Sequence, residues 1–97
     1  MLRATILESS RAKKELRKAP ERVVRAYEIW ASLLEAHGTY VLKNFPGYKD
    51  EKLRGDWSGY RSSRLSKQWR VIYRVTTEKK LEIISVERVT PHDYRRK

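Results

Sequence analysis

The chain has 97 residues, of which 23 are Lys or Arg and 12 are Asp or Glu, so its formal net charge is +11. This length predicts one small domain over residues 1–97. Because it has no cysteine, the chain has no disulfide framework, cysteine-ligated zinc or cysteine nucleophile. Its apolar stretches are too short for a membrane span or a signal peptide, so we expect a cytoplasmic protein with no membrane partner. The charge favours a polyanionic or acidic partner.

The first half of the chain predicts a strand followed by two helices. Residues 2–7 alternate as a strand does, and Ser9 or Ser10 can cap a short, very basic helix over 11–18. Pro20 suits the start of a second helix, which runs to residue 37 and ends at Gly38. Apolar residues recur along this helix at helical spacing: Val23, Val24, Tyr27, Trp30, Ala31 and Leu34. We expect the two helices to form a hairpin with one buried face.

The middle of the chain, residues 39–57, gives weaker signals. Residues 40–45 favour a short helical turn, and the Pro–Gly pair at 46–47 marks another turn. The charged run at 49–52 is expected to be exposed, and residues 56–59 to form a further turn.

The second half predicts three strands, over 60–65, 69–75 and 81–89, joined by turns at 66–68 and 76–80. Three closely spaced strands favour an antiparallel meander. The expected fold is therefore α+β, in the order β-α-α-β-β-β with a short tail. Two N-terminal helices would pack on one face of a small, twisted, mainly antiparallel sheet.

The basic excess is larger in the second half, which carries +7 from residue 49 onwards against +4 before it. Arg70 and Arg74 must share one face of their strand, whereas alternation places Arg88 on the face of Ile84 and Val86. One interpretation is a solvated sheet face. The other is an uncovered face lined with guanidinium groups that hold a phosphate backbone, with neither Arg70 nor Arg88 in the core.

His92 and Tyr94 follow the last strand and are either a polar tail or proton-transfer groups. An endoribonuclease that forms a 2′,3′-cyclic phosphate needs a base, an acid and positive charge for the phosphorane. Histidine suits either proton role, and tyrosine suits one where cations lower its pKa. Trp69, like Trp57 and Tyr60, could pack in the core or stack on bases. No glycine-rich phosphate loop or metal-ligand spacing is found, so we expect no cofactor and no metal.

Two segments of the second half follow a family pattern. Residues 53–61 read LRGDWSGYR and residues 68–75 read QWRVIYRV. Together they resemble the RelE/ParE superfamily of type II toxin–antitoxin toxins, whose pattern is L-x-G-x-x-x-G-x-(R/H) followed by W/Y-R-(I/L/V)-(I/V)-Y. The expected order of strands and helices also resembles that fold over nearly the whole chain.

The resemblance implies a metal-independent mRNA endonuclease that acts in the ribosomal A site. Arg70 matches an arginine that stabilises the transition-state phosphate in RelE-type toxins, and Arg88 matches a second arginine on the last strand. His92 matches the histidine of the YoeB-, YafQ- and HigB-like branches and Tyr94 the tyrosine of RelE, so the main acid–base group stays open. The remaining candidates, for RNA or ribosome binding, are Arg61, Arg64, Arg74, Lys49, Lys52 and Trp69. Of these, Arg64 lies where YafQ-like toxins have a histidine.

The partners implied are a cognate antitoxin, ribosomal RNA and mRNA, with promoter DNA bound only by the toxin–antitoxin complex. Two alternatives stay open: a ParE-like inhibitor of DNA gyrase and a non-catalytic nucleic-acid-binding module of the same fold.

Overall fold

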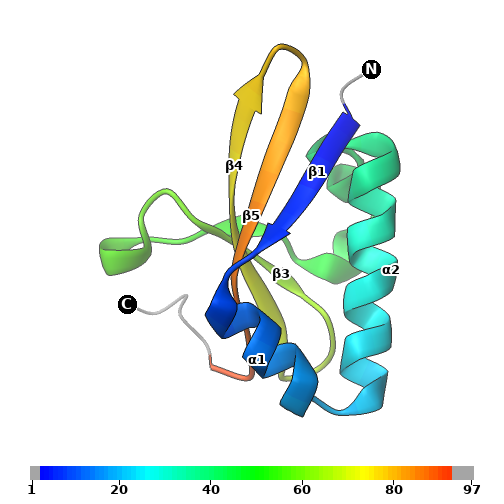
Figure 1. The fold of residues 1–97 in the computed structure, drawn as a ribbon, viewed down its shortest axis with the longest axis vertical. Helices are drawn as coiled ribbons and strands as arrows, with labels where there is room; N and C mark the ends of the chain where they lie inside the picture. Colours follow the sequence, from blue (N-terminus) through cyan, green and yellow to red (C-terminus); the bar gives the residue numbers. More distant parts are fainter. Residues whose placement is uncertain (1–2, 93–97) are drawn as a thin grey trace.

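The computed structural model describes residues 3–92 and shows a five-stranded mixed sheet with α-helices on one side (Figure 1). The strands are β1 (Arg3–Glu8), β2 (Glu51–Lys52), β3 (Arg61–Arg64), β4 (Arg70–Glu78) and β5 (Leu81–Thr90). The helices are α1 (Ser10–Lys18) and α2 (Glu21–His37), followed by the 3-10 helices η1 (Thr39–Asn44), η2 (Pro46–Tyr48) and η3 (Gly55–Trp57). The predicted α+β class is confirmed, and β2 is an additional short strand.

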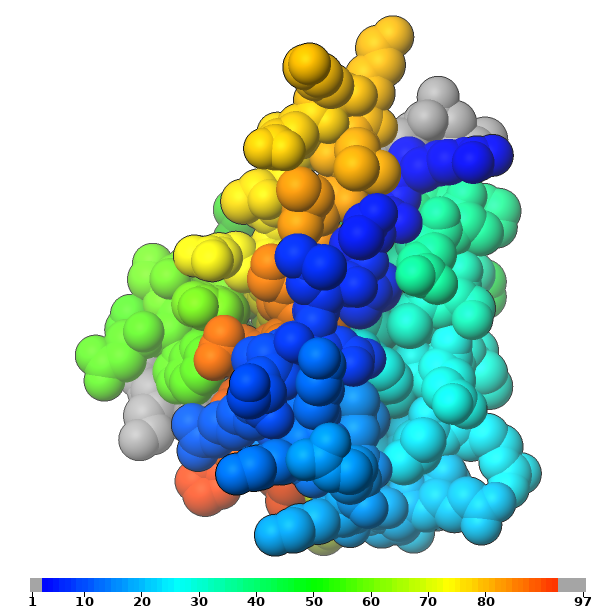
Figure 2. All heavy atoms as spheres, viewed as in Figure 1, coloured from blue at the N-terminus to red at the C-terminus, as the bar shows by residue number. Residues whose placement is uncertain are grey.

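The strand order across the sheet is β1-β5-β4-β3-β2. β3, β4 and β5 form the predicted antiparallel meander, whereas β1 pairs in parallel with β5, from Arg3 opposite Leu81 to Glu8 opposite Val86. β1 therefore ends beside Val86, and within residues 3–92 no strand pairs with the last residues of β5 on that side. α1 packs against β5 there, as Figure 1 and Figure 2 show.

Local sequence sets the helix boundaries. The Ser9 side chain accepts a hydrogen bond from the N–H of Ala12 at 3.0 Å and so caps α1. Pro20 precedes the first turn of α2, where its missing N–H has no helical partner to lose. Gly38, at a φ of 79°, ends α2.

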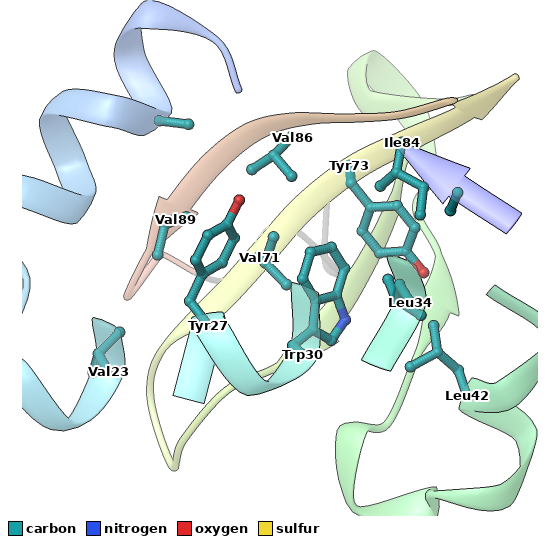
Figure 3. Close-up of a cluster of buried hydrophobic side chains, with 12 residues drawn as sticks. Val23, Tyr27, Trp30, Leu34, Leu42, Val71, Tyr73, Ile84, Val86 and Val89 are labelled. Carbon is teal, nitrogen blue, oxygen red and sulfur yellow. The ribbon is translucent and has the colours of Figure 1, made fainter. Parts of the chain in front are cut away.

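The main core lies between α2 and the sheet and is centred on Trp30 (Figure 3). The Trp30 ring lies 5.7 Å from that of Tyr27 and 5.2 Å from that of Tyr73, centroid to centroid. The predicted stripe of α2 supplies its buried residues: Val23, Tyr27, Trp30 and Leu34. A second, smaller cluster lies on the opposite face of the sheet, where Trp57 and Tyr60 pack on the buried Leu53 and Ile72.

Three sequence-based expectations are wrong. The turn predicted over 76–80 is shorter and consists of Lys79 and Lys80 only. Both residues adopt positive φ, 47° and 69°, which allows a two-residue turn, so β4 continues to Glu78 and β5 begins at Leu81. Arg88 does not share a face with Val86, since an irregularity in the β4–β5 pairing places it opposite Ile72. In the charged run at 49–52, Asp50 is not exposed, because three polar side chains bind it.

No helix within residues 3–92 is both long enough and apolar enough to cross a membrane.

Candidate active site and nucleic-acid interface

Three arginines gather on the sheet face opposite α2, near the end of β5. Arg64, Arg70 and Thr90 form one row across β3, β4 and β5. Directly paired residues point to the same face with their Cβ atoms about 5 Å apart, so Arg64 and Arg70 are neighbours. Arg88 lies opposite Ile72, which makes it the diagonal neighbour of Arg70 at about 7–8 Å. We call Arg64, Arg70 and Arg88 the arginine cluster.

The arginine cluster is partly buried, contrary to the expectation that Arg70 lies outside the core. Arg70 is only 6% exposed, and Arg64 is half-buried. The Nε of Arg64 is buried and has no hydrogen-bond partner within residues 3–92. Like charges held close together in a partly dry site favour a bound anion, and a phosphate has oxygens for several guanidinium donors at once.

Arg88 is held by Glu15 of α1, which the sequence did not single out. The Nε of Arg88 donates to Glu15 Oε2 at 2.9 Å, and its Nη2 donates to the same oxygen at 2.5 Å. Glu15 Oε1 accepts from the backbone N–H of Val89 at 2.9 Å. The carboxylate thus orients Arg88. It also accepts the hydrogen bond of the Val89 N–H, which a neighbouring strand would otherwise accept.

His92 lies two residues beyond the end of β5, and its backbone N–H donates to Thr90 Oγ1 at 3.1 Å. Thr90 belongs to the same row as Arg64 and Arg70, so this bond keeps the exposed His92 at the edge of the arginine cluster. Tyr94, the other proton-transfer candidate, lies outside the described residues.

Arg61 lies on the other face of the sheet, opposite Tyr73 and away from the arginine cluster. Its Nε and Nη2 donate to Asp50 Oδ1 at 2.7 and 2.6 Å. Burial disfavours the charged guanidinium, but the hydrogen bond and charge of Asp50 outweigh it and raise the pKa of Arg61. Arg61 is thus part of an internal ion pair.

Asp50 Oδ2 accepts two further hydrogen bonds, from Ser63 Oγ at 2.6 Å and from the hydroxyl of Tyr73. Burial, followed by the charge of Asp50, raises the pKa of Tyr73. We call Asp50, Arg61, Ser63 and Tyr73 the Asp50 cluster. It joins the segment before β2 to both β3 and β4.

The predicted uncovered face exists only in part. Arg70 and Arg74 share a face, as their spacing predicts, but the apolar Ile72 lies between them and is covered by Leu53, Trp57 and Tyr60. Arg74 lies over the Tyr60 ring, 5.6 Å from its centroid. The apolar cluster around Ile72 therefore lies between Arg74 and the arginine cluster. Arg74 is four positions along β4 from Arg70, or about 13 Å.

The remaining candidates lie apart from the arginine cluster. Trp69 packs against the main core, which fits the packing interpretation of its ring. Lys52 lies in the row of Arg61 and Tyr73, three residues or about 10 Å along the sheet from Arg70. Lys49 is exposed at the end of η2. Of the candidates within residues 3–92, the structure therefore brings together Arg64, Arg70, Arg88 and His92. Within residues 3–92, no three carboxylate or imidazole groups gather as metal ligands would.

Glu15 and Asp50, the partners of Arg88 and Arg61, are carboxylates that sequence reasoning missed. Glu15 is the one acidic residue of α1, whose sequence is SRAKKELRK. A single acid in an otherwise basic helix was the sequence feature that could have pointed to a specific ion pair. Asp50 stands in a charged run that gave no indication of burial.

The chain matches no protein-family model and no curated protein. Solved structures resemble it over most of its length. YafQ from E. coli strain BL21(DE3) has a TM-score of 0.72 and 24% identity, with 90% of this chain and 91% of that chain covered. The YoeB/ParE toxin from Agrobacterium tumefaciens has a TM-score of 0.68 and 20% identity, with 92% and 99% covered. A chain of the E. coli DinJ–YafQ toxin–antitoxin complex has a TM-score of 0.65 and 26% identity, with 92% and 91% covered.

The fold is that of the RelE/ParE-superfamily toxins. The RelE-like architecture expected from residues 53–61 and 68–75 is thereby confirmed. The roles of Arg70, Arg88, His92 and Tyr94 in such a toxin stay predictions.

Proposed function

We propose that this protein is the toxin of a type II toxin–antitoxin module and cleaves mRNA on the ribosome without a metal. The observation that carries the proposal is the arginine cluster, with His92 at its edge, on a RelE-like sheet. Three guanidinium groups at one end of a sheet fit a phosphate that gains negative charge during the reaction.

In the proposed reaction, the 2′-hydroxyl oxygen of the mRNA attacks the adjacent phosphorus and the bond to the 5′-oxygen breaks. The products are a 2′,3′-cyclic phosphate and a 5′-hydroxyl. A base removes the proton of the 2′-hydroxyl, and an acid protonates the leaving 5′-oxygen. Arg70 and Arg88 stabilise the phosphorane, and Arg64 adds positive charge. His92 and Tyr94 are the proton-transfer candidates.

The partners proposed are a cognate antitoxin, the ribosome with its mRNA and, for the toxin–antitoxin complex, promoter DNA. The net charge of +11 supports docking on ribosomal RNA, and the exposed basic side chains of α1 (Arg11, Lys13, Lys14, Arg17 and Lys18) would contribute to it. Arg61, Arg74, Lys49, Lys52 and Trp69 stay weaker candidates for RNA contact, because they lie apart from the arginine cluster.

The test is induced expression followed by primer extension on a reporter mRNA, with and without translation. We expect cuts only in translated mRNA and their loss in Arg70→Ala and Arg88→Ala. Arg25→Ala is the matched control, since Arg25 forms only an exposed ion pair with Glu21. Comparing His92→Gln with Tyr94→Phe separates the two proton-transfer candidates. Intact mRNA together with a supercoiling defect would instead identify a ParE-like gyrase inhibitor, and intact mRNA with normal supercoiling a non-catalytic module.

A further inference from the structure

Arg74, Tyr60 and Trp57 contact one another on the sheet face opposite α2. The guanidinium carbon of Arg74 lies 5.6 Å from the centroid of the Tyr60 ring. The Tyr60 and Trp57 ring centroids are 5.1 Å apart, with 78° between the ring planes. Arg74 shares this face with Arg70, because the two residues are four positions apart on β4. We call Trp57, Tyr60 and Arg74 the aromatic platform.

The fold holds the two rings of the aromatic platform in place. They pack on the buried Leu53 and Ile72 and are themselves half-buried. The backbone N–H of Tyr60 donates to the C=O of Trp57 at 3.0 Å, and the C=O of Tyr60 accepts from the N–H of Leu53 at 2.9 Å. A ligand that contacts the exposed parts of the rings therefore meets side chains that are already ordered, which lowers the entropic cost of binding.

Arg74 differs from Arg61 and Arg88 because, within residues 3–92, it forms no ion pair. Arg61 and Arg88 are bound by carboxylates and are partly buried. Arg74 is exposed, and it lies over the Tyr60 ring. A guanidinium is planar and carries five N–H donors at its edge, so it can stack on a flat group and also bind an acceptor. The fold thus leaves a flat cation open to a ligand.

The distance between the aromatic platform and the arginine cluster suits two parts of one RNA strand. Arg74 is about 13 Å from Arg70 along β4, which is too far for both to bind one phosphate. This length corresponds to about four nucleotides of a stacked strand, at about 3.4 Å each, and to fewer nucleotides of an extended strand. A strand that runs along β4 from the arginine cluster, past Ile72, thus brings a neighbouring base to the aromatic platform.

Aromatic rings combined with a guanidinium are typical of sites for unpaired bases. Bases of single-stranded RNA stack on tyrosine and tryptophan rings and on arginine, because every base has a flat π-face. The positive charge also attracts the phosphates next to that base. Packing on Ile72 explains the two rings, but it does not explain an exposed Arg74 over Tyr60.

We propose that the aromatic platform stacks an unpaired base of the RNA strand whose reacting phosphate lies in the arginine cluster. Trp57 and Tyr60 supply the rings, and Arg74 supplies a flat cation that also binds an oxygen of the RNA. This inference rests on the proposed function, because it takes RNA to be the ligand of the arginine cluster. It adds a contact to a base, which an arginine cluster that holds phosphate does not provide.

The probe is a fluorescein-labelled 2′-O-methyl oligonucleotide of sequence UAUAUAUA, which cannot be cleaved because it has no free 2′-hydroxyl. A second oligonucleotide has the same backbone and no bases. Both are titrated into the full chain at low salt and followed by fluorescence anisotropy. We expect the oligonucleotide with bases to bind about tenfold more tightly, because stacking contributes to its binding only.

Two variants assign this preference for bases to the aromatic platform. Arg74→Lys keeps the charge and loses the planar group, and Tyr60→Leu keeps an apolar cover on Ile72 and loses the ring. In both variants the affinities for the two oligonucleotides should come within about twofold of each other. Urea unfolding checks that the variants are folded, and Arg74→Lys, at an exposed position, keeps the test valid if Tyr60→Leu is unstable.

Tyr40→Leu is the matched control. Tyr40 is also an exposed ring beside a cation, with Lys43 Nζ 4.8 Å from its centroid, but it belongs to η1 and lies away from the arginine cluster. This variant should keep the tenfold preference for bases. Arg70→Ala should weaken binding of both oligonucleotides by the same factor, because it removes a phosphate contact that they share.

Equal affinity of the wild type for the two oligonucleotides would overturn the inference. A preference for bases that persists in both Arg74→Lys and Tyr60→Leu would also overturn it, because the base would then stack elsewhere. If neither oligonucleotide binds, the inference is wrong, and primer extension decides the ribonuclease activity separately. Failure of the proposed function gives a different result: Arg70→Ala would leave both affinities unchanged, while the two platform variants would still remove the preference for bases.

Discussion

Glu15 binds Arg88 through one carboxylate oxygen and the backbone N–H of Val89 through the other. This contact connects the first α-helix to the last strand at the point where β1 has ended. It therefore stabilises the fold and sets the orientation of one member of the arginine cluster.

Removing the Glu15 carboxylate should destabilise the protein. The side chains of Glu15 and Arg88 are only 20% and 11% exposed, so Glu15→Ala removes the carboxylate partner of Arg88 and the acceptor of the Val89 N–H in a poorly solvated place. We expect the free energy of unfolding, measured with urea, to fall by about 2 kcal/mol. Glu21→Ala is the control, because its partner Arg25 is exposed, and it should cost about 0.5 kcal/mol or less. Equal losses in the two variants would show that the Glu15 contact is energetically an ordinary surface pair.

Asp50→Asn tests the Asp50 cluster. The amide cannot accept all the hydrogen bonds from Arg61, Ser63 and Tyr73, and it leaves the Arg61 guanidinium without its counter-charge. We expect a loss of about 2 kcal/mol in the free energy of unfolding, because the Asp50 side chain is only 10% exposed. Asp56→Asn, on the exposed η3 turn, should leave stability unchanged. An unaffected Asp50→Asn protein would mean that the cluster does not help to hold β2 and β3 on β4.

The raised pKa of Tyr73 makes stability depend on pH at the alkaline end. Burial and the Asp50 charge favour the neutral phenol in the folded chain, whereas the unfolded tyrosine ionises near its ordinary value of about 10. The stabilisation is therefore complete below pH 10 and is lost as the pH rises above it. Between pH 8 and pH 11 wild type should lose about 1 kcal/mol more than Tyr73→Phe in urea unfolding. Parallel losses in the two proteins would assign the alkaline effect to other groups.

The turn between β4 and β5 should accept a stabilising replacement. Lys79 and Lys80 hold positive φ, which favours Asn and Gly at the two positions of such a turn. The double variant Lys79→Asn/Lys80→Gly should gain about 0.5–1 kcal/mol in the free energy of unfolding. Lys79→Ala/Lys80→Ala, which removes the same charges without relieving the backbone, should gain nothing. A gain in both variants would point to charge repulsion in place of backbone strain.

Periodicity predicted most of the fold because local patterns determine helices and strands. The stripe of α2 and the alternation of β4 led to the correct elements and the correct core around Trp30. The irregularity near Ile72 shifted Arg88 to the other face, and alternation alone cannot reveal it. The partners of Arg88 and Arg61, which are Glu15 and Asp50, lie 73 and 11 positions away in the sequence, and their pairing depends on the folded sheet.

The parallel pairing of β1 with β5 has a consequence for synthesis of the chain. β1 and α1 leave the ribosome first, yet both complete their contacts only with β5, the last strand. During translation, the ion pair of Glu15 with Arg88 and the strand pairing of Arg70 with Thr90 can form only after β5 has been made. The topology therefore delays assembly of the arginine cluster until the last strand, β5, has been made and has paired with β4.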